Sequence, residues 1–193
     1  MKALRQAAAG CRGCDLYKEA IQTVFGEGSA RATIMFVGEQ PGDHEDQEGH
    51  PFVGPAGKLF RTALAAAGLK PKDVYITNAV KHFKFVWRGK RRIHAKPRRI
   101  EVIACRPWLE AELQEVRPAI VVALGATAAQ ILLGSAFRLT QHRGEFLSSE
   151  LAPKIIATVH PSAILRAPDD EARKRELAAF IADLKIVAKT AQR

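Results

Sequence analysis

Four short runs of apolar, largely β-branched residues are the strongest constraint on how this chain folds. They span residues 32–39, 74–80, 119–125 and 155–160. Each run is almost continuously apolar, which is typical of strands buried on both faces of a parallel sheet. Helical patterns lie between and after them, at residues 56–69, 98–116, 126–133 and 177–187. This alternation predicts an α/β fold of three layers, α/β/α, with a central, mostly parallel four-stranded sheet.

The length and composition agree with a single domain. The chain has 193 residues, of which 47% are hydrophobic, and this is enough to bury a sizeable core in one unit. No repeat, low-complexity tract or linker divides the sequence, so we expect one domain over residues 1–193. No apolar run approaches the roughly 18 residues of a membrane-spanning helix, and the N-terminal residues lack the apolar stretch of a secretory signal. We therefore expect a cytoplasmic protein without a membrane partner.

The charge of the chain points to a polyanionic partner. Thirty Lys and Arg residues against 20 Asp and Glu residues give a net charge of +10. Such an excess favours nucleic acid before membrane, since each neutralised phosphate releases counterions. Charge alone leaves a second interpretation open, in which the basic residues only keep the surface soluble.

Polar side chains follow three of the predicted strands. Glu39, Gln40 and Asp43 follow the first run, Asn78 lies in the last turn of the second, and His-Pro-Ser at 160–162 ends the fourth. In an open parallel sheet, ligands bind in the crevice outside the carboxyl ends of the strands. Each segment alone has an ordinary explanation as a turn, a buried amide or a helix start. Their convergence at one edge favours a binding or catalytic site.

Three cysteines favour a metal centre over a disulfide framework, since their number is odd. Cys11 and Cys14 form a Cys-x-x-Cys pair, and Cys105 lies far downstream. Such a pair can bind zinc, bind an iron–sulfur cluster or do dithiol chemistry. The last option is weak because the pair precedes the first predicted strand. His82 is the candidate for a fourth ligand, although a histidine that binds no metal is the more ordinary interpretation.

A basic loop, Lys-Arg-Arg-Ile-His at residues 90–94, ends in a histidine at its tip. By itself this segment is typical of a solvated run of charge that contacts phosphates. His94 alone is most simply a surface or DNA-contacting histidine.

Several motifs together resemble those of the iron–sulfur uracil-DNA glycosylases. The first is GEQPGDHEDQEGHPFVGPAGKLF at residues 38–60. The others are TNAVK at 77–81, ACRPWL at 104–109, LGATAA at 124–129 and HPSAILR at 160–166. The match extends from Cys11 to the terminal helix. It implies the three-layer uracil-DNA glycosylase fold and excision of uracil from DNA.

Three departures from the usual iron–sulfur pattern resemble the branch of the family called UdgX. Gln40 stands where alanine is usual, His82 replaces a cluster cysteine, and residues 88–94 form a basic insertion. In that branch the histidine of the Lys-Arg-Arg-Ile-His loop bonds covalently to the deoxyribose after uracil is removed. The resemblance also implies a [4Fe–4S] cluster, with zinc as the alternative. Its ligands would be Cys11, Cys14, His82 and Cys105.

The resemblance and the chemistry of each side chain suggest roles at the strand ends. Gly38 and Phe52 both belong to the first motif and are expected to bind the substrate. Phe52 suits stacking on a flipped pyrimidine, although alone it is an ordinary core aromatic. Asn78 can pair with the edge of uracil and reject cytosine. His160 suits a hydrogen bond to O2 of the departing base. The residues expected to bind DNA phosphates are Ser162, Arg166 and Arg92.

His94 decides between two mechanisms. A neutral imidazole nitrogen can attack C1′ of the oxocarbenium ion that forms on cleavage, where most glycosylases use water. The new bond has no facile leaving step, so the reaction would stop after one turnover. Glu39 is expected to orient the imidazole or accept its proton, and to stabilise the sugar cation. Gln40 and Asp43 would complete this wall of the pocket, and Asp43 could position water in hydrolytic relatives.

Two other functions stay open on the sequence alone. One is a conventional multi-turnover uracil-DNA glycosylase, and the other is a non-enzymatic iron–sulfur protein that binds DNA. The polar and aromatic residues at the strand ends argue against the second, because a pure binder has no need of them. We expect uracil-containing DNA, preferably single-stranded, as the partner, uracil as the product, and a monomer.

Overall fold

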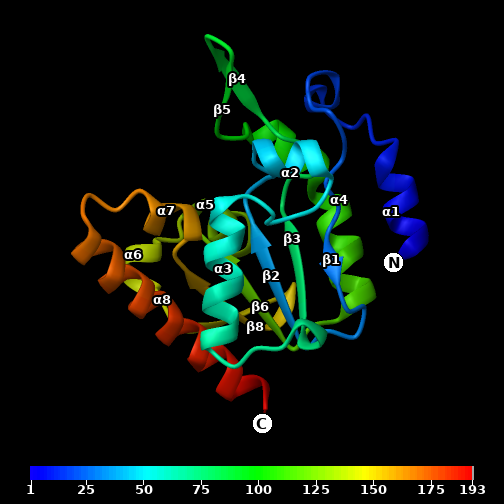
Figure 1. Cartoon of the computed structure of the whole chain (residues 1–193). Coiled ribbons are helices and arrows are strands. Elements are labelled where there is room, and N and C mark those ends of the chain that lie inside the picture. Colours follow the sequence, from blue (N-terminus) through cyan, green and yellow to red (C-terminus); the bar gives the residue numbers. More distant parts are fainter. Residues whose placement is uncertain (193) are drawn as a thin grey trace.

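The computed structural model describes residues 1–192 and consists of a central sheet with helices on both faces (Figure 1). The strand order in this sheet is β1-β3-β2-β6-β8-β7. The strands are β1 (Glu27–Gly28), β2 (Ile34–Gly38), β3 (Val74–Asn78), β6 (Ile120–Leu124), β7 (Phe146–Ser149) and β8 (Ala152–Thr158).

The four strands predicted from the apolar runs form the parallel centre of the sheet, as β3, β2, β6 and β8. This confirms the α/β/α architecture with a mostly parallel sheet. The sheet is wider than the four strands expected, because β1 and β7 add an antiparallel strand at each edge. Neither edge strand has an apolar signal of its own. β1 is only two residues long, and β7 is partly exposed.

Helices fill the two outer layers. They are α1 (Lys2–Ala9), α2 (Asp43–Glu48), α3 (Pro55–Ala66), α4 (Arg99–Val116), α5 (Ala126–Leu133), α6 (Leu139–His142), α7 (Pro161–Leu165) and α8 (Asp170–Ala191), with 3₁₀ turns η1 (Asp15–Lys18) and η2 (Pro71–Asp73). The helical patterns of the sequence correspond to α3, α4, α5 and α8. Over residues 1–192, no helix is long and apolar enough to cross a membrane.

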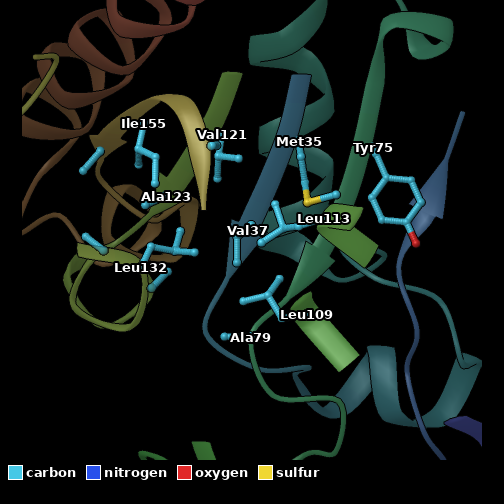
Figure 2. Packing of buried hydrophobic residues seen from close by; sticks show 14 of the residues in the cluster. Met35, Val37, Tyr75, Ala79, Leu109, Leu113, Val121, Ala123, Leu132 and Ile155 are labelled. Atoms are coloured by element: carbon cyan, nitrogen blue, oxygen red, sulfur yellow. The ribbon is translucent and has the colours of Figure 1, made fainter. Parts of the chain in front are cut away.

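Strand β2 explains why the apolar runs are continuous. Met35 and Val37 point into a core shared with α4 and α5, where they meet residues such as Leu113 (Figure 2). Ile34 and Phe36 point into the opposite core, which α3, α7 and α8 cover. Successive side chains of a strand face opposite sides, so a strand between two helical layers needs apolar residues at every position.

The basic segment is a β-hairpin with His94 at its base, which corrects the expectation of a loop with the histidine at its tip. The hairpin, made of β4 (Phe85–Arg88) and β5 (Arg91–His94), projects from the body of the protein (Figure 1). Gly89 has a φ of +58° at the turn, a left-handed conformation that glycine adopts without strain. In the antiparallel register, His94 lies opposite Phe85. The fold therefore ties His94 to the body and leaves Lys90 at the outer end.

A buried ion pair joins the end of β3 to α4. Lys81 Nζ lies 2.5 Å from Glu112 Oε2, and both side chains are fully buried. The same ammonium donates to Thr77 Oγ1 (2.7 Å) and to the backbone oxygen of Asn78 (2.6 Å). Every donor direction of Lys81 is thereby used close to the last residue of β3. This network fixes the backbone of Asn78 at the carboxyl edge of the sheet.

Replacing Glu112 by Ala is expected to lower the free energy of unfolding by about 3–5 kcal/mol, because it leaves the Lys81 ammonium buried without a counterion. Urea unfolding of the two proteins measures this difference. Glu115 is the matched control, since it lies on the same helix with 47% of its side chain exposed. The Glu115→Ala loss should stay within about 1 kcal/mol. Equal losses in the two variants would contradict the role given to the buried pair.

Candidate active site at the carboxyl edge of the sheet

A cavity of about 700 Å³ opens at the carboxyl ends of β2, β3, β6 and β8. Most of the residues expected at the site line it together. They are Glu39, Gln40, Phe52, Asn78, His94, His160, Ser162 and Arg166. Three of the strand ends and the base of the hairpin thus contribute to one site. The expected residues Gly38, Asp43 and Arg92 are not part of this lining. The four candidate metal ligands do not line the cavity either.

Gly38 lets two groups converge on the floor of the cavity. In the parallel register it lies opposite Asn78. A Cβ atom on Gly38 would stand 2.2 Å from Asn78 Oδ1 and 2.9 Å from Phe52 Cζ. Any larger residue would therefore displace the Asn78 amide or the Phe52 ring. The absence of a side chain at Gly38 thus leaves room for the Asn78 and Phe52 side chains.

Phe52 is held in a strained backbone conformation beside the cavity. Its φ is +57°, which is uncommon for a residue with a side chain. Its ring centroid lies 5.2 Å from that of Phe60 and 5.8 Å from that of His160. Gly57 in α3 makes this position possible, since a Cβ there would stand 1.8 Å from the Phe52 carbonyl oxygen. Strain of this kind costs about 1–3 kcal/mol and persists only where the surroundings impose it.

His160 is a neutral hydrogen-bond donor whose tautomer is fixed by its neighbour. The Ser162 backbone N–H donates to His160 Nδ1 (3.1 Å), and Ser162 Oγ lies 2.8 Å from the same atom. Burial lowers the pKa of His160 to about 4, and the positive charge of Arg166 acts in the same direction. Because Nδ1 accepts a hydrogen bond, the ring proton of the neutral form is on Nε2.

The same hydrogen bonds change the interpretation of Ser162, which was expected to bind a phosphate. Its hydroxyl and its N–H are both used to orient His160. Helix α7 is a single short turn of five residues, so it adds little dipole for an anion. Arg166, at the end of α7, is exposed and lines the cavity. It is the better placed of the two for a phosphate.

Glu39 and His94 face each other across the mouth of the cavity. His94 Nε2 lies 3.5 Å from Glu39 Oε1, and about half of the His94 side chain is exposed. Apart from this approach of His94, Glu39 Oε1 is buried and makes no hydrogen bond within residues 1–192. A buried carboxylate oxygen without a hydrogen bond is costly, which indicates that it is available to a positive charge or a donor.

Gln40 fastens the base of the hairpin to the end of β2. Its Nε2 donates to the backbone oxygens of Lys84 (3.0 Å) and Ala95 (3.1 Å), and its Oε1 accepts from the Lys84 N–H (3.1 Å). The two residues flank the hairpin on either side, and Ala95 N–H also donates to the Lys84 oxygen. Gln40 thus positions His94, which directly precedes Ala95, beside Glu39.

Arg92 turns into the protein, which differs from the expected phosphate contact. Its guanidinium pairs with Asp43 (2.6 Å) and with the buried Asp46 (2.5 Å). It also lies over the rings of Phe83 and Phe85. Asp43 is correspondingly used to hold the hairpin and sits outside the cavity wall where it was expected. Arg92 is therefore a second attachment of the hairpin, through α2.

Glu45 is a structural residue of the site that sequence reasoning missed. Its two carboxylate oxygens accept the backbone N–H groups of Gly42 and Gly54. These glycines flank the two loops that carry Gln40 and Phe52. The sequence did contain a signal for this role. Glu45 lies three residues after Gly42, the N-cap of α2, and this is the spacing of a capping box.

The three cysteines gather near the end of β3. Cys14 packs against a small buried cluster that contains Cys105. Cys11 Sγ accepts a hydrogen bond from Trp108 Nε1 (3.1 Å), and Cys105 Sγ accepts one from the Lys81 N–H (3.2 Å). Donors of this kind around sulfur are a feature of iron–sulfur sites, where they tune the cluster.

His82 is buried, and its Nε2 lies 3.0 Å from Thr23 Oγ1. In the described part of the chain, no three His, Cys, Asp or Glu side chains lie close enough together to hold a metal ion. Ligands of an iron–sulfur cluster bind different irons, so they stand further apart than the ligands of one ion. Three thiols and one imidazole fit such a cluster by their chemistry.

Comparison with known proteins decides the family. Residues 25–185 match the profile described as "Uracil DNA glycosylase superfamily". This chain belongs to that superfamily. The type-4 uracil-DNA glycosylase of Thermotoga maritima is 35% identical over 175 residues, which cover 90% of this chain and 88% of that protein. The type-4 uracil-DNA glycosylase of Archaeoglobus fulgidus is 38% identical over 165 residues, covering 82% and 79%.

A type-5 uracil-DNA glycosylase, from Pyrobaculum aerophilum, is also similar, with 34% identity over 156 residues that cover 71% of this chain and 64% of that protein. The longer matches favour the type-4 branch for this glycosylase. Membership of the superfamily supports the uracil-DNA glycosylase activity and the role in DNA repair that the motifs predict.

Replacing Gln40 by Met is expected to loosen the hairpin, because the backbone groups of Lys84 and Ala95 lose three hydrogen bonds. We expect a loss of about 2 kcal/mol in the free energy of unfolding and faster amide hydrogen exchange confined to residues 84–95. Mass spectrometry of peptic fragments measures both the rate and its location. Gln114→Met is the control, since Gln114 is exposed on α4 and contacts neither the hairpin nor its partners in the hydrogen bonds of residues 1–192. Unchanged exchange in the hairpin of the Gln40 variant would show that Arg92 alone holds it.

Proposed function

We propose that this glycosylase excises uracil from DNA and then bonds covalently to the remaining sugar through His94. The observation that supports this most directly is the 3.5 Å approach of His94 Nε2 to Glu39 Oε1 at the mouth of the cavity. A nucleophile and a carboxylate thus stand beside the position that the sugar would occupy. Family membership supports the excision step, and the geometry of His94 is the argument for capture.

Uracil recognition rests on Phe52 and Asn78. A base inside a DNA stack is out of reach, so the nucleotide enters the cavity flipped out or from a single strand. The Phe52 ring suits stacking on the pyrimidine. The Asn78 amide has a donor and an acceptor for N3 and O4 of uracil. Cytosine has an amino group and an unprotonated N3 at these positions, so a fixed amide would reject it.

Cleavage leaves negative charge on the base and positive charge on the sugar. The bond between C1′ and N1 breaks, and its electron pair stays on uracil. His160 Nε2–H would donate to O2 of the departing base, where charge develops only during the reaction. A neutral ring with its proton on Nε2 is the form this role requires. The free Glu39 carboxylate would stabilise the cation at C1′.

Capture then competes with hydrolysis at C1′. A lone pair of the His94 imidazole forms the new N–C1′ bond, and the ring becomes an imidazolium. Its remaining N–H proton passes to Glu39 or to solvent, and water protonates the uracil anion. The histidine is held in place by Gln40, so it needs no rearrangement to reach the sugar. Asp43, engaged with Arg92, is not free to hold a water at this point.

We propose a [4Fe–4S] cluster for this protein. Zinc, the alternative, needs its ligands around one ion, and the described side chains are not gathered in that way. The ligands would be Cys11, Cys14, His82 and Cys105. When bound, the cluster supplies a rigid connection between the N-terminal segment, the residues after β3 and α4. The Lys81 N–H would donate to the Cys105 sulfur, and the Lys81 side chain fixes the Asn78 backbone on the other side. These residues link the cluster region to the part of the site that would recognise uracil.

DNA binding is proposed to use the basic residues that the fold leaves exposed. Lys90 and Arg91 at the hairpin end and Arg166 at the cavity are exposed, and they suit phosphate contacts. Single-stranded DNA is the expected substrate, since no base pair needs to open before the nucleotide enters the cavity. We also propose, as expected from the sequence, that the protein is a monomer and that it acts in the cytoplasm.

Denaturing gel electrophoresis with a labelled single-stranded oligonucleotide that contains one uracil tests this function. We expect the wild-type protein to give a shifted band that resists heat and detergent. His94→Ala should lose this band completely and still leave DNA that alkali breaks, because excision does not need the nucleophile. His142→Ala, a surface histidine outside the cavity, is the control and should behave as wild type.

The other outcomes separate the alternatives. Alkali-labile DNA without a stable band in the wild type would mean an ordinary multi-turnover glycosylase. If the wild type gives neither a stable band nor alkali breakage, the protein would be a non-enzymatic DNA-binding protein. A duplex of the same sequence, run alongside, measures the expected preference for single strands.

A further inference from the structure

Three aromatic residues alternate along the segment that enters the hairpin. The ring centroids of Phe83 and Phe85 are 5.2 Å apart, and those of Phe85 and Trp87 are 5.5 Å apart. The first two rings are buried, whereas Trp87 is 64% exposed. The series therefore runs from the core of the site out into solvent along one strand.

The two inner rings have a clear structural purpose. Arg92 stacks on both Phe83 and Phe85, and the His94 ring lies 6.3 Å from that of Phe83. Together they support the base of the hairpin. Trp87 lies beyond this contact region and leaves most of its indole in water. A large exposed aromatic side chain on a projecting element indicates a binding surface.

The strand register places Trp87 on the face of the hairpin that includes His94. Phe85 lies opposite His94, and Trp87 lies opposite Arg92. Partners across an antiparallel pair point to the same face, as do residues two apart in a strand. Trp87 therefore stands on the same face as His94, about 7 Å further along the strand toward the turn.

The charge around Trp87 identifies the class of ligand. Arg88, Lys90 and Arg91 are exposed at the outer end of the hairpin. Lys90 lies in the turn, and the Arg88–Arg91 pair adjoins Trp87 along the strands but alternates to the other face. Basic residues next to an exposed aromatic ring are the combination with which proteins bind single-stranded nucleic acid, since bases stack on the ring and phosphates meet the cations. An apolar protein partner would not need this charge.

We propose that Trp87 stacks on the base of the nucleotide adjacent to the uracil. With the uridine sugar at His94, the neighbouring nucleotide of a single strand would pass along the hairpin face toward the turn. Its base would cover the exposed indole, and its phosphate would meet Lys90 in the turn or the long side chains of Arg88 and Arg91 at the hairpin end. This inference rests on the proposed function in taking uracil-containing DNA as the ligand and in placing the sugar beside His94. It does not require the covalent bond to form.

Equilibrium binding tests the inference with an oligonucleotide in which 2′-fluoro-2′-deoxyuridine replaces the uridine. The fluorine destabilises the sugar cation, so the DNA stays intact. Trp87→Leu keeps an apolar side chain without a ring and should weaken binding by about 10-fold or more. Trp87→Phe should recover most of the loss. Ile186→Ala, at an exposed apolar residue of α8, controls for loss of surface hydrophobicity and should bind as wild type.

An abasic spacer on either side of the uridine locates the stacked base. We expect one of the two spacers to weaken wild-type binding by a similar factor and to leave Trp87→Leu unaffected, because the lost stacking partner is then already absent. Equal effects of both spacers on the two proteins would overturn the inference, as would unchanged binding by Trp87→Leu. Release of uracil by the wild type from the unfluorinated oligonucleotide is measured in parallel, so a failure of the proposed function is recognised separately.

Discussion

One side-chain amide joins the hairpin to the central sheet, and the geometry of the site depends on it. Gln40 bonds to the backbone on both sides of the hairpin, while its neighbour Glu39 points into the cavity. The same turn after β2 thus sets the position of the carboxylate and of the histidine that faces it. A hairpin held only by its own two strands would be marginally stable. Gln40 and Arg92 turn it into a fixed part of the cavity.

The remaining groups are also positioned before any substrate arrives. Ser162 sets the tautomer of His160, Gly57 makes room for the strained Phe52 backbone, and Lys81 holds the end of β3. Glu39 Oε1 makes no hydrogen bond in the described structure and faces His94 at 3.5 Å. The strained Phe52 backbone and this carboxylate oxygen cost stability, and two well-packed cores offset the cost. Such preorganisation is what stabilises charge that develops only in the transition state.

The architecture could be predicted because it depends on local pattern. Apolar residues at every position of β2 and β6 indicate strands between two layers, and parallel strands bring their carboxyl ends to one edge. The convergence of Glu39, Asn78 and His160 followed from this rule alone. The width of the sheet could not be predicted from this rule, since β1 has only two residues and no apolar pattern.

The details of the site could not be predicted because they depend on contacts between distant segments. Gln40 meets residues 44 and 55 positions away, and Arg92 meets Asp46, which is 46 positions away. Charge alone suggested that Arg92 binds DNA, yet two carboxylates turn it inward. Ser162 likewise bonds to its own histidine. The hairpin register, which places His94 at the base, could not be predicted because the basic residues 88–94 have no strand pattern.

The most direct test of the central claim is mass spectrometry of the protein after reaction with uracil-containing single-stranded DNA and digestion of the nucleic acid. We expect a deoxyribose-derived mass addition on the peptide that contains His94, with fragment ions that place it on the imidazole, and no need for a reducing agent. An addition on Lys90 or another lysine, trapped only by borohydride, would contradict the account. So would unmodified protein in a sample from which uracil had been released.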